Sequence, residues 1–443
     1  MNPEQRRAYV LGGGVAGLTA AFALADRGFA VELLESRPRL GGRAFSTDDK
    51  VTGQRLDNGA HVMLGCYTST RRLLRRLGTE QHFQQDRRLE LAYRSLVPTP
   101  RTLRLKLSRL PVPLAMPLAL LGMDLSLGTR LRALRGMLTT VLGAPPDRSL
   151  AQWFDRRKQR GEPAAYLWEP LCRAVMNVEP EAAQAMDFLA TLREAFSGKA
   201  AAAAFWIPLR PWGELFGDPA PQALAAAKVA LHTGARVTGL EVHEHFVTAI
   251  HTGDGGRREI APRDVVVSAM PWHALAGVLH ERFRQPFAQL ASAPIVTVYC
   301  ALREGAKSPP DEGPVVALVD GAPFHFLLRR PGEPSGRFAL LSGGDRSLDG
   351  STVGDITARA AKQLRRYYPD ADLDGATMRV RKEQHATFVA GPGSHKRRPE
   401  PGRLTPVAGN LWVCGDWTAT GLPATLEGAA RSGEEVVAAI ARD

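Results

Sequence analysis

The 443-residue chain has only four cysteines, and they lie far apart in the sequence, at Cys66, Cys172, Cys300 and Cys414. None stands beside a second cysteine or a histidine at the spacing of a metal site, so no metal is expected. Separated thiols of this kind are typical of a reducing compartment, where we expect them to be buried and unpaired.

The chain also lacks any run of roughly 20 apolar residues, the length that a membrane-spanning helix needs. The first apolar strand begins within about ten residues of the N-terminus, too early for a signal peptide. We therefore expect a cytoplasmic protein, peripheral on the inner face of the membrane if it meets a membrane at all.

Acidic residues are the scarcer charged type: 45 stand against 57 basic ones, for a net charge of +12 and a pI near 9.9. No nucleic-acid-binding motif accompanies this charge, so no nucleic-acid partner is expected. Two interpretations stay open. The basic groups form an ordinary solvated surface, or they attract anionic lipid.

A glycine-rich turn begins the part of the sequence that carries specific information. Gly12, Gly14 and Gly17 follow a predicted strand at 8–11 and open a predicted helix at 15–25 in the pattern G-x-G-x-x-G. The three glycines allow a tight turn, a close approach to a pyrophosphate, and tight packing of the helix on the strand. The first helical residues, Val15 and Ala16, would offer free N–H groups to phosphate oxygens.

An acidic residue follows at the distance expected for a dinucleotide site. Glu35 ends the predicted strand 30–35, 18 residues after Gly17, where it would accept hydrogen bonds from ribose hydroxyls, with Ser36 beside it. Gly42 and Arg43 then provide another close backbone approach and a guanidinium for phosphate oxygens. This succession resembles the amine oxidase and carotenoid desaturase group of flavoproteins, and the resemblance implies FAD as the cofactor.

The C-terminal end carries the complementary signal. A predicted strand at 410–414 runs into Gly415 and Asp416, which in that flavoprotein group lie beside the ribityl chain and the pyrophosphate. The turn at Pro423, Ala424 and Thr425 precedes a predicted helix at 427–439. The helix start would direct N–H groups at the flavin pyrimidine edge and stabilise anionic reduced flavin.

The middle of the chain completes the predicted fold. A helix at 223–231 is followed by a strand at 235–242, in which Val237 resembles the residue that contacts adenine in related flavoproteins, and by a strand at 264–269. We expect an α/β protein with a Rossmann-like FAD-binding domain built from discontinuous segments (1–75, 225–280 and 404–443). The remaining segments, 76–224 and 281–403, would form an α+β substrate domain over the flavin, which also contacts the membrane.

Two segments supply candidates for catalysis. In Leu56–His61, small Gly59 and Ala60 suit the isoalloxazine edge, and Asp57 and His61 are polar groups near it, although Asp57 equally suits the cap of a turn. In the apolar stretch 168–177, burial would raise the pKa of Glu169 and make it an acid. The alternative is that Glu169 and Pro170 simply begin a helix.

The stretch 102–142 combines basic and apolar residues. Arg104, Lys106 and Arg109 precede the leucine-rich run 110–121, which is interrupted by three prolines, and Arg130, Arg132 and Arg135 follow with helical spacing. The prolines exclude a regular spanning helix. The stretch therefore predicts either a surface that dips into one leaflet or an apolar wall of the substrate cavity.

Taken together, the segments 56–61, 168–172, 382–388 and 415–428 resemble the hydroxysqualene dehydroxylases of bacterial hopanoid synthesis, also described as squalene-associated FAD-dependent desaturases. The resemblance runs over nearly the whole chain, but Ala60 stands where relatives often have glutamine. It implies a C30 isoprenoid alcohol as substrate, squalene-pathway enzymes as partners, and hydride delivery to an allylic cation after Asp57, His61 or Glu169 protonates the leaving hydroxyl. Rival hypotheses are a carotenoid-type desaturase that uses oxidised FAD, an amine oxidase, and a non-catalytic isoprenoid carrier.

Overall fold

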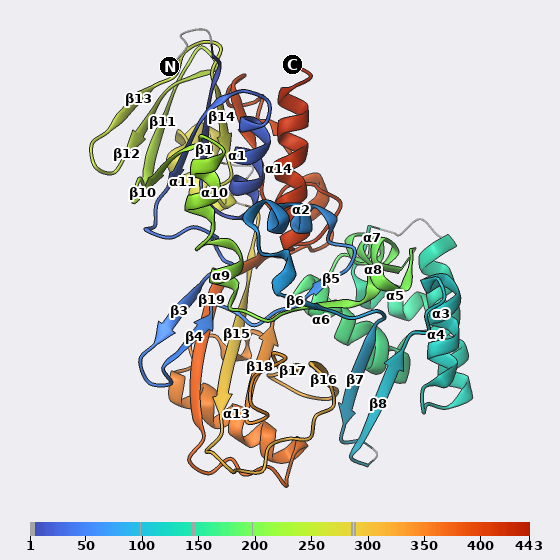
Figure 1. The fold of residues 1–443 in the computed structure, drawn as a ribbon. Coiled ribbons are helices and arrows are strands. Elements are labelled where there is room, and N and C mark those ends of the chain that lie inside the picture. The colour runs from blue at the N-terminus through green and yellow to red at the C-terminus, as the bar shows by residue number, and fades with distance from the viewer. Residues whose placement is uncertain (1–4, 98, 143–146, 197, 285–286, 288) are drawn as a thin grey trace.

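The computed structural model describes residues 5–97, 99–142, 147–196, 198–284, 287 and 289–443. For residues 141 and 142 it describes the backbone alone. Its first layer is a six-stranded sheet near the two chain ends (Figure 1). In spatial order the strands are β10 (Ala230–Thr233), β2 (Ala30–Glu35), β1 (Arg7–Leu11), β14 (Val265–Ser268), β21 (Leu411–Val413) and β20 (Gly402–Arg403). Each neighbouring pair is parallel except β21–β20. The central strands are short runs of buried apolar residues, as expected for a parallel sheet covered on both faces.

Strands from the two ends and the middle of the sequence therefore share one sheet, which confirms the predicted discontinuous α/β architecture. Helices α1 (Val15–Ala25) and α14 (Leu426–Ile440) lie side by side against it (Figure 1). Their contact is so close that a Cβ added at Gly433 would lie 2.6 Å from the carbonyl oxygen of Ala16. The domain boundaries themselves stay a prediction.

One predicted element is wrong. The helix expected at 223–231 is α10 (Ala220–Ala226), and residues 230–233 instead form the edge strand β10. The alanine-rich sequence favours a helix, but Lys228 has a φ of 57°, which ends helical geometry. The open edge of β2 then pairs with the residues that follow.

Smaller elements surround this sheet. An antiparallel sheet is formed by β11 (Val237–His243), β12 (Phe246–Thr252) and β13 (Arg257–Glu259). The adjoining helices are α2 (Thr68–Leu77), α9 (Trp212–Phe216) and α11 (Trp272–Val278). Two further small sheets are β3 (Ser46–Asp49) with β4 (Gln54–Asp57), and β5 (Met63–Leu64), β9 (Phe205–Pro208) and β6 (Phe83–Gln85).

The second part of the molecule is built on a seven-stranded sheet. Its order is β19 (Thr377–Phe388), β15 (Ser292–Ala301), β18 (Arg337–Gly343), β17 (Phe326–Leu328), β16 (Val315–Leu318), β7 (Glu90–Ser95) and β8 (Arg101–Lys106). Helix α13 (Val353–Tyr367) covers one face. There Ile356, Ala360 and Leu364 join Val296 and Val298 of β15 in one buried cluster. The other face of β15 is left to line the interior.

A helical group completes this part: α3 (Val112–Gly122), α4 (Leu127–Leu142), α5 (Leu150–Arg157), a π-helical turn (Ala164–Trp168), α6 (Glu169–Met176), α7 (Ala185–Phe196) and α8 (Ala200–Ala203). Short 3-10 turns lie at Glu80–His82, Glu281–Phe283, Arg346–Leu348 and Ser394–Lys396. Among the described residues, no helix combines the length and the apolar character needed to cross a bilayer.

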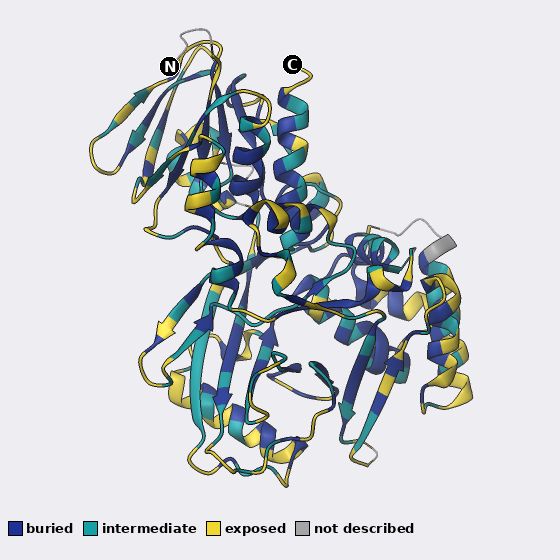
Figure 2. Ribbon diagram, viewed as in Figure 1, coloured by how far each residue is buried: buried dark blue, intermediate teal, exposed yellow. Residues whose placement is uncertain are grey.

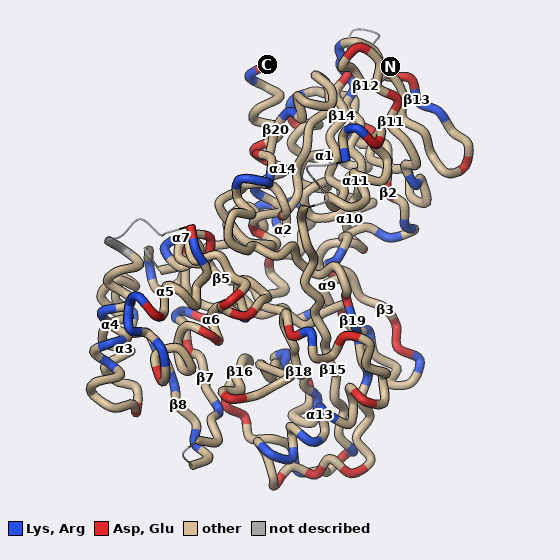
Figure 3. The backbone as a smooth tube through the Cα atoms, turned by 180° about the vertical axis from the view of Figure 1, so that it is seen from behind, with Lys and Arg blue, Asp and Glu red and all other residues tan. Residues whose placement is uncertain are grey.

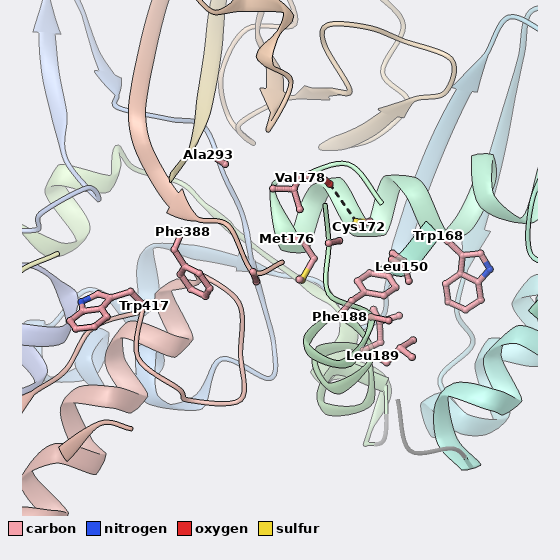
Figure 4. Close-up of a cluster of buried hydrophobic side chains, with 14 of the residues drawn as sticks. Leu150, Trp168, Cys172, Met176, Val178, Phe188, Leu189, Ala293, Phe388 and Trp417 are labelled. Carbon is pink, nitrogen blue, oxygen red and sulfur yellow. Dashed lines mark hydrogen bonds between the residues drawn. The ribbon is translucent and has the colours of Figure 1, made fainter. Parts of the chain in front are cut away.

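One apolar cluster connects the helical group to the first sheet (Figure 4). It runs from Trp168 and Phe188 through Met176 and Phe388 to Trp417, which follows the predicted cofactor residues at 415–416. Burial of such a continuous apolar surface holds the two parts in one arrangement. The four thiols are unpaired, and those of Cys172, Cys300 and Cys414 are buried.

Candidate flavin-binding and active site

The glycine turn and the start of α1 form a cradle for phosphate. Gly12 has a φ of 108°, and a Cβ at Gly17 would lie only 1.9 Å from the Gly12 carbonyl oxygen. Gly14 stands at the N-cap and brings no side chain to cap the helix. The first-turn N–H groups, including those of Val15 and Ala16, therefore keep their donor capacity for a ligand anion.

A second glycine pair lies directly on the first. The Gly41 N–H donates to the Gly13 carbonyl at 2.9 Å. A Cβ at Gly42 would lie 3.0 Å from the Cα of Gly14, so any larger residue would fill this space. Two backbone segments without side chains thus face one another where the sequence predicts the pyrophosphate.

Glu35 is held at the end of β2 beside this cradle. Its carboxylate is 8% exposed and accepts hydrogen bonds from the Gly13 N–H at 2.7 Å, the Arg37 N–H at 2.8 Å and the Ser36 hydroxyl at 3.0 Å. The Arg37 carbonyl in turn accepts from the Gly234 N–H at 3.2 Å, which brings the start of β11, with buried Val237, toward the same loop.

The two chain ends meet in a direct ion pair. The Arg43 guanidinium donates to Asp416 at 2.5 Å, across 373 residues of sequence, and to the Ala386 carbonyl at 2.6 Å. Gly415 has a φ of 144°, and its N–H donates to Ser432 of α14 at 2.8 Å. Residues predicted to contact one cofactor are thereby brought together by the tertiary fold.

The start of α14 is capped from within the chain. The Thr425 hydroxyl, which follows Pro423 and Ala424, accepts the Gly428 N–H at 2.9 Å. Glu427 is 1% exposed and accepts the backbone N–H groups of Ser69 at 3.1 Å and Thr70 at 3.0 Å. It therefore caps α2, a role that the sequence did not reveal, because a glutamate in a first helical turn is ordinary there.

The segment 59–61 lies against strand β15. A Cβ at Gly59 would be 3.8 Å from the Thr297 hydroxyl and 3.9 Å from Ile295. The Thr297 hydroxyl is buried and has no hydrogen-bond partner within the described part of the chain. Ala60 is half-buried.

His61 stacks on Trp212 with ring centroids 3.9 Å apart, and its Nδ1 lies 2.8 Å from the Gly59 carbonyl oxygen. Since a carbonyl only accepts, Nδ1 carries the proton and Nε2 is an acceptor. Burial lowers the pKa of His61 to about 4. The imidazole is thus neutral near pH 7 and poorly suited to donate a proton.

Asp57 is engaged on both carboxylate oxygens. Oδ1 accepts from the Ser46 hydroxyl at 2.6 Å and from the backbone N–H of Trp212 at 2.7 Å. Oδ2 accepts from the Arg330 guanidinium at 2.6 Å. The side chain is only 1% exposed. Burial raises the pKa of Asp57, and Arg330 with the other two donors opposes that effect. The arrangement is that of a buried structural ion pair.

Glu169 begins α6, with Pro170 in the first turn, which is the helix-start alternative that the sequence left open. Its side chain is 30% exposed, 3.5 Å from Arg173, whereas Arg173 binds Glu179 more closely at 2.7 Å. Burial, followed by the nearby charges of Glu179 and Glu181, raises the pKa of Glu169 against the effect of Arg173.

The three candidate acids lie at two different cavities. A cavity of about 70 Å³ is lined by Asp57, Ala60 and His61, and one of about 800 Å³ is lined by Glu169. Strand β15 borders both, through Tyr299 in the smaller and Ala293 in the larger. Ala293 is two residues from Ile295, so at about 3.3 Å per residue the larger cavity comes within roughly 7 Å of the position facing Gly59.

The residues present fit FAD. The facing glycine pairs leave room for a pyrophosphate, the uncapped α1 supplies donors, and Glu35, Arg43 and Asp416 surround the cradle. In the described residues, no group of three His, Cys, Asp or Glu side chains is placed to hold a metal ion.

Comparison with protein families matches residues 15–441 to the flavin containing amine oxidoreductases. The chain belongs to that family. It is an FAD-dependent oxidoreductase, which confirms the predicted cofactor and class of enzyme.

Among curated proteins, the chain is 29% identical to the hydroxysqualene dehydroxylase of Rhodopseudomonas palustris, over 96% of each chain. It is 28% identical to that of Zymomonas mobilis, over 96% of this chain and 97% of the relative. The zeta-carotene desaturase of Synechocystis is 25% identical over 98% of this chain and 97% of its own. The predicted resemblance to hydroxysqualene dehydroxylases is thereby confirmed.

Solved structures agree on the fold. An oxidoreductase from Methanosarcina mazei superposes with a TM-score of 0.75 at 16% identity, over 97% of this chain and 99% of that one. Putrescine oxidase bound to putrescine gives a TM-score of 0.71 at 15% identity over 99% of both chains. At 15–16% sequence identity, these similarities show the fold and nothing more about this chain.

Proposed function

We propose that this enzyme removes the hydroxyl group of hydroxysqualene, a C30 allylic alcohol, to give squalene. The names of the relatives in Rhodopseudomonas and Zymomonas support this substrate class. The observation that carries the proposal is the cavity of about 800 Å³. That volume falls within the range of about 300–1,000 Å³ typical of small-molecule sites.

The lining of this cavity combines apolar residues, which suit a hydrocarbon chain, with charged and polar residues. Much of its wall is apolar and small, contributed by Ala165, Pro170, Val178, Ala182, Ala291, Ala293, Leu318, Val319 and Val389. The charged and polar side chains of the lining are those of Glu169, Arg173, Glu179, Asp320, His325, Asp345 and Arg346. Burial lowers the pKa of His325 to about 4, so it is neutral near pH 7.

The proposed reaction breaks one C–O bond. The hydroxyl takes a proton and leaves as water, and the carbon left behind is an allylic cation stabilised by delocalisation. The chemistry supplied by bound, reduced FAD is hydride donation. One alcohol, one proton and one hydride thus give one hydrocarbon and one water. The residues of the chain have to supply the proton and keep bulk water away from the cation.

We assign the proton to Glu169. Its pKa is raised, so its protonated form is more populated near neutral pH than that of an ordinary glutamate. Arg173 is engaged by Glu179 through two close contacts, which leaves Glu169 only the 3.5 Å contact. Asp57 and His61 are less suitable, since the first is paired with Arg330 and the second is neutral.

The test is an anaerobic single turnover. Prereduced enzyme is mixed with hydroxysqualene, and oxidised enzyme is mixed with squalene or diapophytoene, while flavin absorbance and products are followed. We expect flavin oxidation and squalene in the first mixture only. Bleaching in the second mixture alone would instead indicate a desaturase, the activity named for the Synechocystis relative.

The acid is tested in the same assay with two matched variants. Glu169→Gln should slow the turnover by about 10²–10⁴-fold, the usual contribution of a general acid. Glu259→Gln, at a side chain 72% exposed on β13, serves as the control and should keep the wild-type rate. Equal rates for both variants would remove Glu169 from the mechanism but leave the overall reaction standing.

We further propose that α3 and α4 contact the surface of an anionic bilayer. Leu114, Leu118 and Leu121 form one exposed stripe on α3, and Leu127, Leu131 and Leu138 form another on α4, with exposed fractions from 39% to 65%. The opposite side of α3 is buried (Figure 2). Neither cavity takes a lining residue from 102–142, so the interpretation of this stretch as a cavity wall has no support from them.

Basic groups lie next to these stripes. Arg104 and Lys106 are exposed on β8, where both contact Glu90, and Arg132 and Arg135 are exposed on α4. Figure 3 shows basic segments along both elements. An exposed apolar face flanked by cations is the pattern of a helix that lies in the lipid interface. The substrate is itself lipid-soluble, so such a contact would place the enzyme where its substrate dissolves.

Vesicle sedimentation tests this contact. Leu118→Ser with Leu131→Ser should reduce binding to vesicles of phosphatidylglycerol and phosphatidylcholine by about tenfold or more, because partial burial of each leucine contributes on the order of 1 kcal/mol. Val353→Ser is the control, since Val353 is 61% exposed at the start of α13. Unchanged binding of the double variant would exclude this surface as the contact.

A further inference from the structure

Arg398 forms an ion pair with Asp187 in the interior of the molecule. The two side chains are 1% and 5% exposed, and Arg398 Nη2 donates to Asp187 Oδ2 at 3.1 Å. In the part of the chain that the structure describes, the Asp187 carboxylate accepts from no other group. The guanidinium also lies over the ring of Phe388, 4.7 Å from its centroid. A pair so far withdrawn from water needs further well-placed hydrogen bonds to offset the cost of its burial.

The other terminal nitrogen of Arg398 supplies those hydrogen bonds. Nη1 donates to two backbone carbonyls of the segment 418–422, that of Thr418 at 3.3 Å and that of Leu422 at 3.1 Å. Asp187 lies in the first turn of α7, within the helical group of the second part of the molecule. One guanidinium therefore fastens the segment 418–422 to a helix that is distant from it in the sequence.

The segment 418–422 connects two stretches that are predicted to contact the flavin. It runs from Asp416, beside the predicted ribityl chain, to the turn 423–425 at the start of α14. Its backbone is held a second time by the Ala419 N–H, which donates to the Pro399 carbonyl at 2.8 Å. A shift of this segment would be passed to the start of α14, where N–H groups are expected at the flavin pyrimidine edge.

We propose that Arg398 is a positioning residue for the flavin, and that Asp187 holds its guanidinium in place and cancels its charge. The planar guanidinium directs its donors along fixed directions, so one carboxylate and two carbonyls keep a set separation. Helix α7 packs against α6, which carries Glu169, so the same pair connects the larger cavity to the cofactor. This inference depends on FAD at its predicted place but makes no use of the proposed substrate.

Flavin affinity tests the positioning role. Arg398→Lys keeps the charge but has a single nitrogen, which cannot reproduce the directions of the planar fork. We expect FAD to bind about tenfold more weakly or worse, measured by flavin fluorescence as apoenzyme is titrated. The control is Arg94→Lys on β7, where Arg94 lies 3.6 Å from the buried carboxylate of Glu312 and donates to the Tyr367 carbonyl. It should lower the free energy of unfolding and leave FAD affinity unchanged.

The midpoint potential of the bound flavin tests the charge balance. Asp187→Asn leaves the Arg398 guanidinium without a counter-charge, and an uncompensated cation stabilises the anionic reduced flavin, so the potential should rise. Burial raises the pKa of Asp187, and Arg398 opposes that effect. In Arg398→Gln the carboxyl therefore takes up a proton more readily, and the potential should not rise. A role in packing alone would move both potentials in the same direction.

Unchanged FAD affinity in Arg398→Lys, or a potential that Asp187→Asn does not raise, would overturn the proposal. If Arg398→Lys does not fold, Asp187→Asn still decides, because it keeps the guanidinium and its two carbonyl contacts. Neither measurement involves hydroxysqualene. A negative result here therefore leaves the proposed dehydroxylation standing, and failure of the dehydroxylation assay leaves this inference standing.

Discussion

Replacement of Asp57 by asparagine tests whether this residue is a structural ion-pair partner or a free acid. The substitution keeps the shape of the side chain. Asn Oδ1 can still accept from the Ser46 hydroxyl and the Trp212 N–H, which lie 2.6 and 2.7 Å from Asp57 Oδ1. The amide nitrogen would then face the Arg330 guanidinium, so two donors would meet where a salt bridge stood.

The magnitude follows from burial. Asp57 is 1% exposed and Arg330 is 18% exposed, so solvent screens the pair little. Breaking a buried pair from one side costs about 3–5 kcal/mol, because the remaining charge is left uncompensated. Arg330 keeps Glu333 at 2.9 Å, so we place the loss at the lower end, about 3 kcal/mol.

Urea unfolding followed by tryptophan fluorescence measures this loss. The matched control is Asp218→Asn, whose carboxylate is 48% exposed and pairs with Arg55, so it should cost no more than about 1 kcal/mol. The double variant Asp57→Asn with Arg330→Met should recover much of the loss, since it leaves no unpaired charge. Equal losses for the two single variants would refute the structural role and return Asp57 to the list of acids.

Three further predictions concern the cofactor cradle, the proposed acid and the helix contact. Gly17→Ala should release FAD, because the added Cβ would lie 1.9 Å from the Gly12 carbonyl oxygen across the turn. The loss is measured as flavin absorbance per protein. The control Gly277→Ala, whose Cβ meets nothing within 4 Å, should keep the flavin. Glu179→Gln should move the alkaline fall of the pH–rate profile to lower pH, because the negative charge at Glu179 helps to raise the pKa of Glu169. An alkaline fall at the wild-type pH would count against Glu169 as the acid. Glu427→Gln should lower the free energy of unfolding by about 1.5–3 kcal/mol, since a charged acceptor for two buried N–H groups is lost; no change in the urea midpoint would show that this contact contributes little.

The elements around the glycine turn were predicted closely because their signals are local. Helix 15–25 and strand 30–35 have the same bounds in sequence and structure. A turn that needs glycine, a helix of small apolar residues and a buried strand that ends in an acid are each set by neighbours within a few residues. The strand at 230–233 was missed because its partner, β2, lies almost 200 residues away in the sequence.

The candidate acids show the opposite case. Asp57, His61 and Glu169 were chosen by residue type, and nothing near them in sequence indicated that Arg330 pairs with the first. Nor did the sequence show that Trp212 stacks on His61. Environment decides the protonation of such groups, and environment here comes from distant segments.

The amino-acid sequence alone determined the dinucleotide-binding turn and the sheet of discontinuous strands, because phosphate and ribose recognition depend on backbone turns and on a few side chains at short spacing. The flavin class and FAD followed from the resemblance of these segments to a flavoprotein group. Only the tertiary structure decided which carboxyl is free, which cavity is large enough for a long chain, and that the leucines of α3 and α4 face outward. Those properties depend on what packs against each side chain, and the packing partners come from segments that the linear order keeps apart.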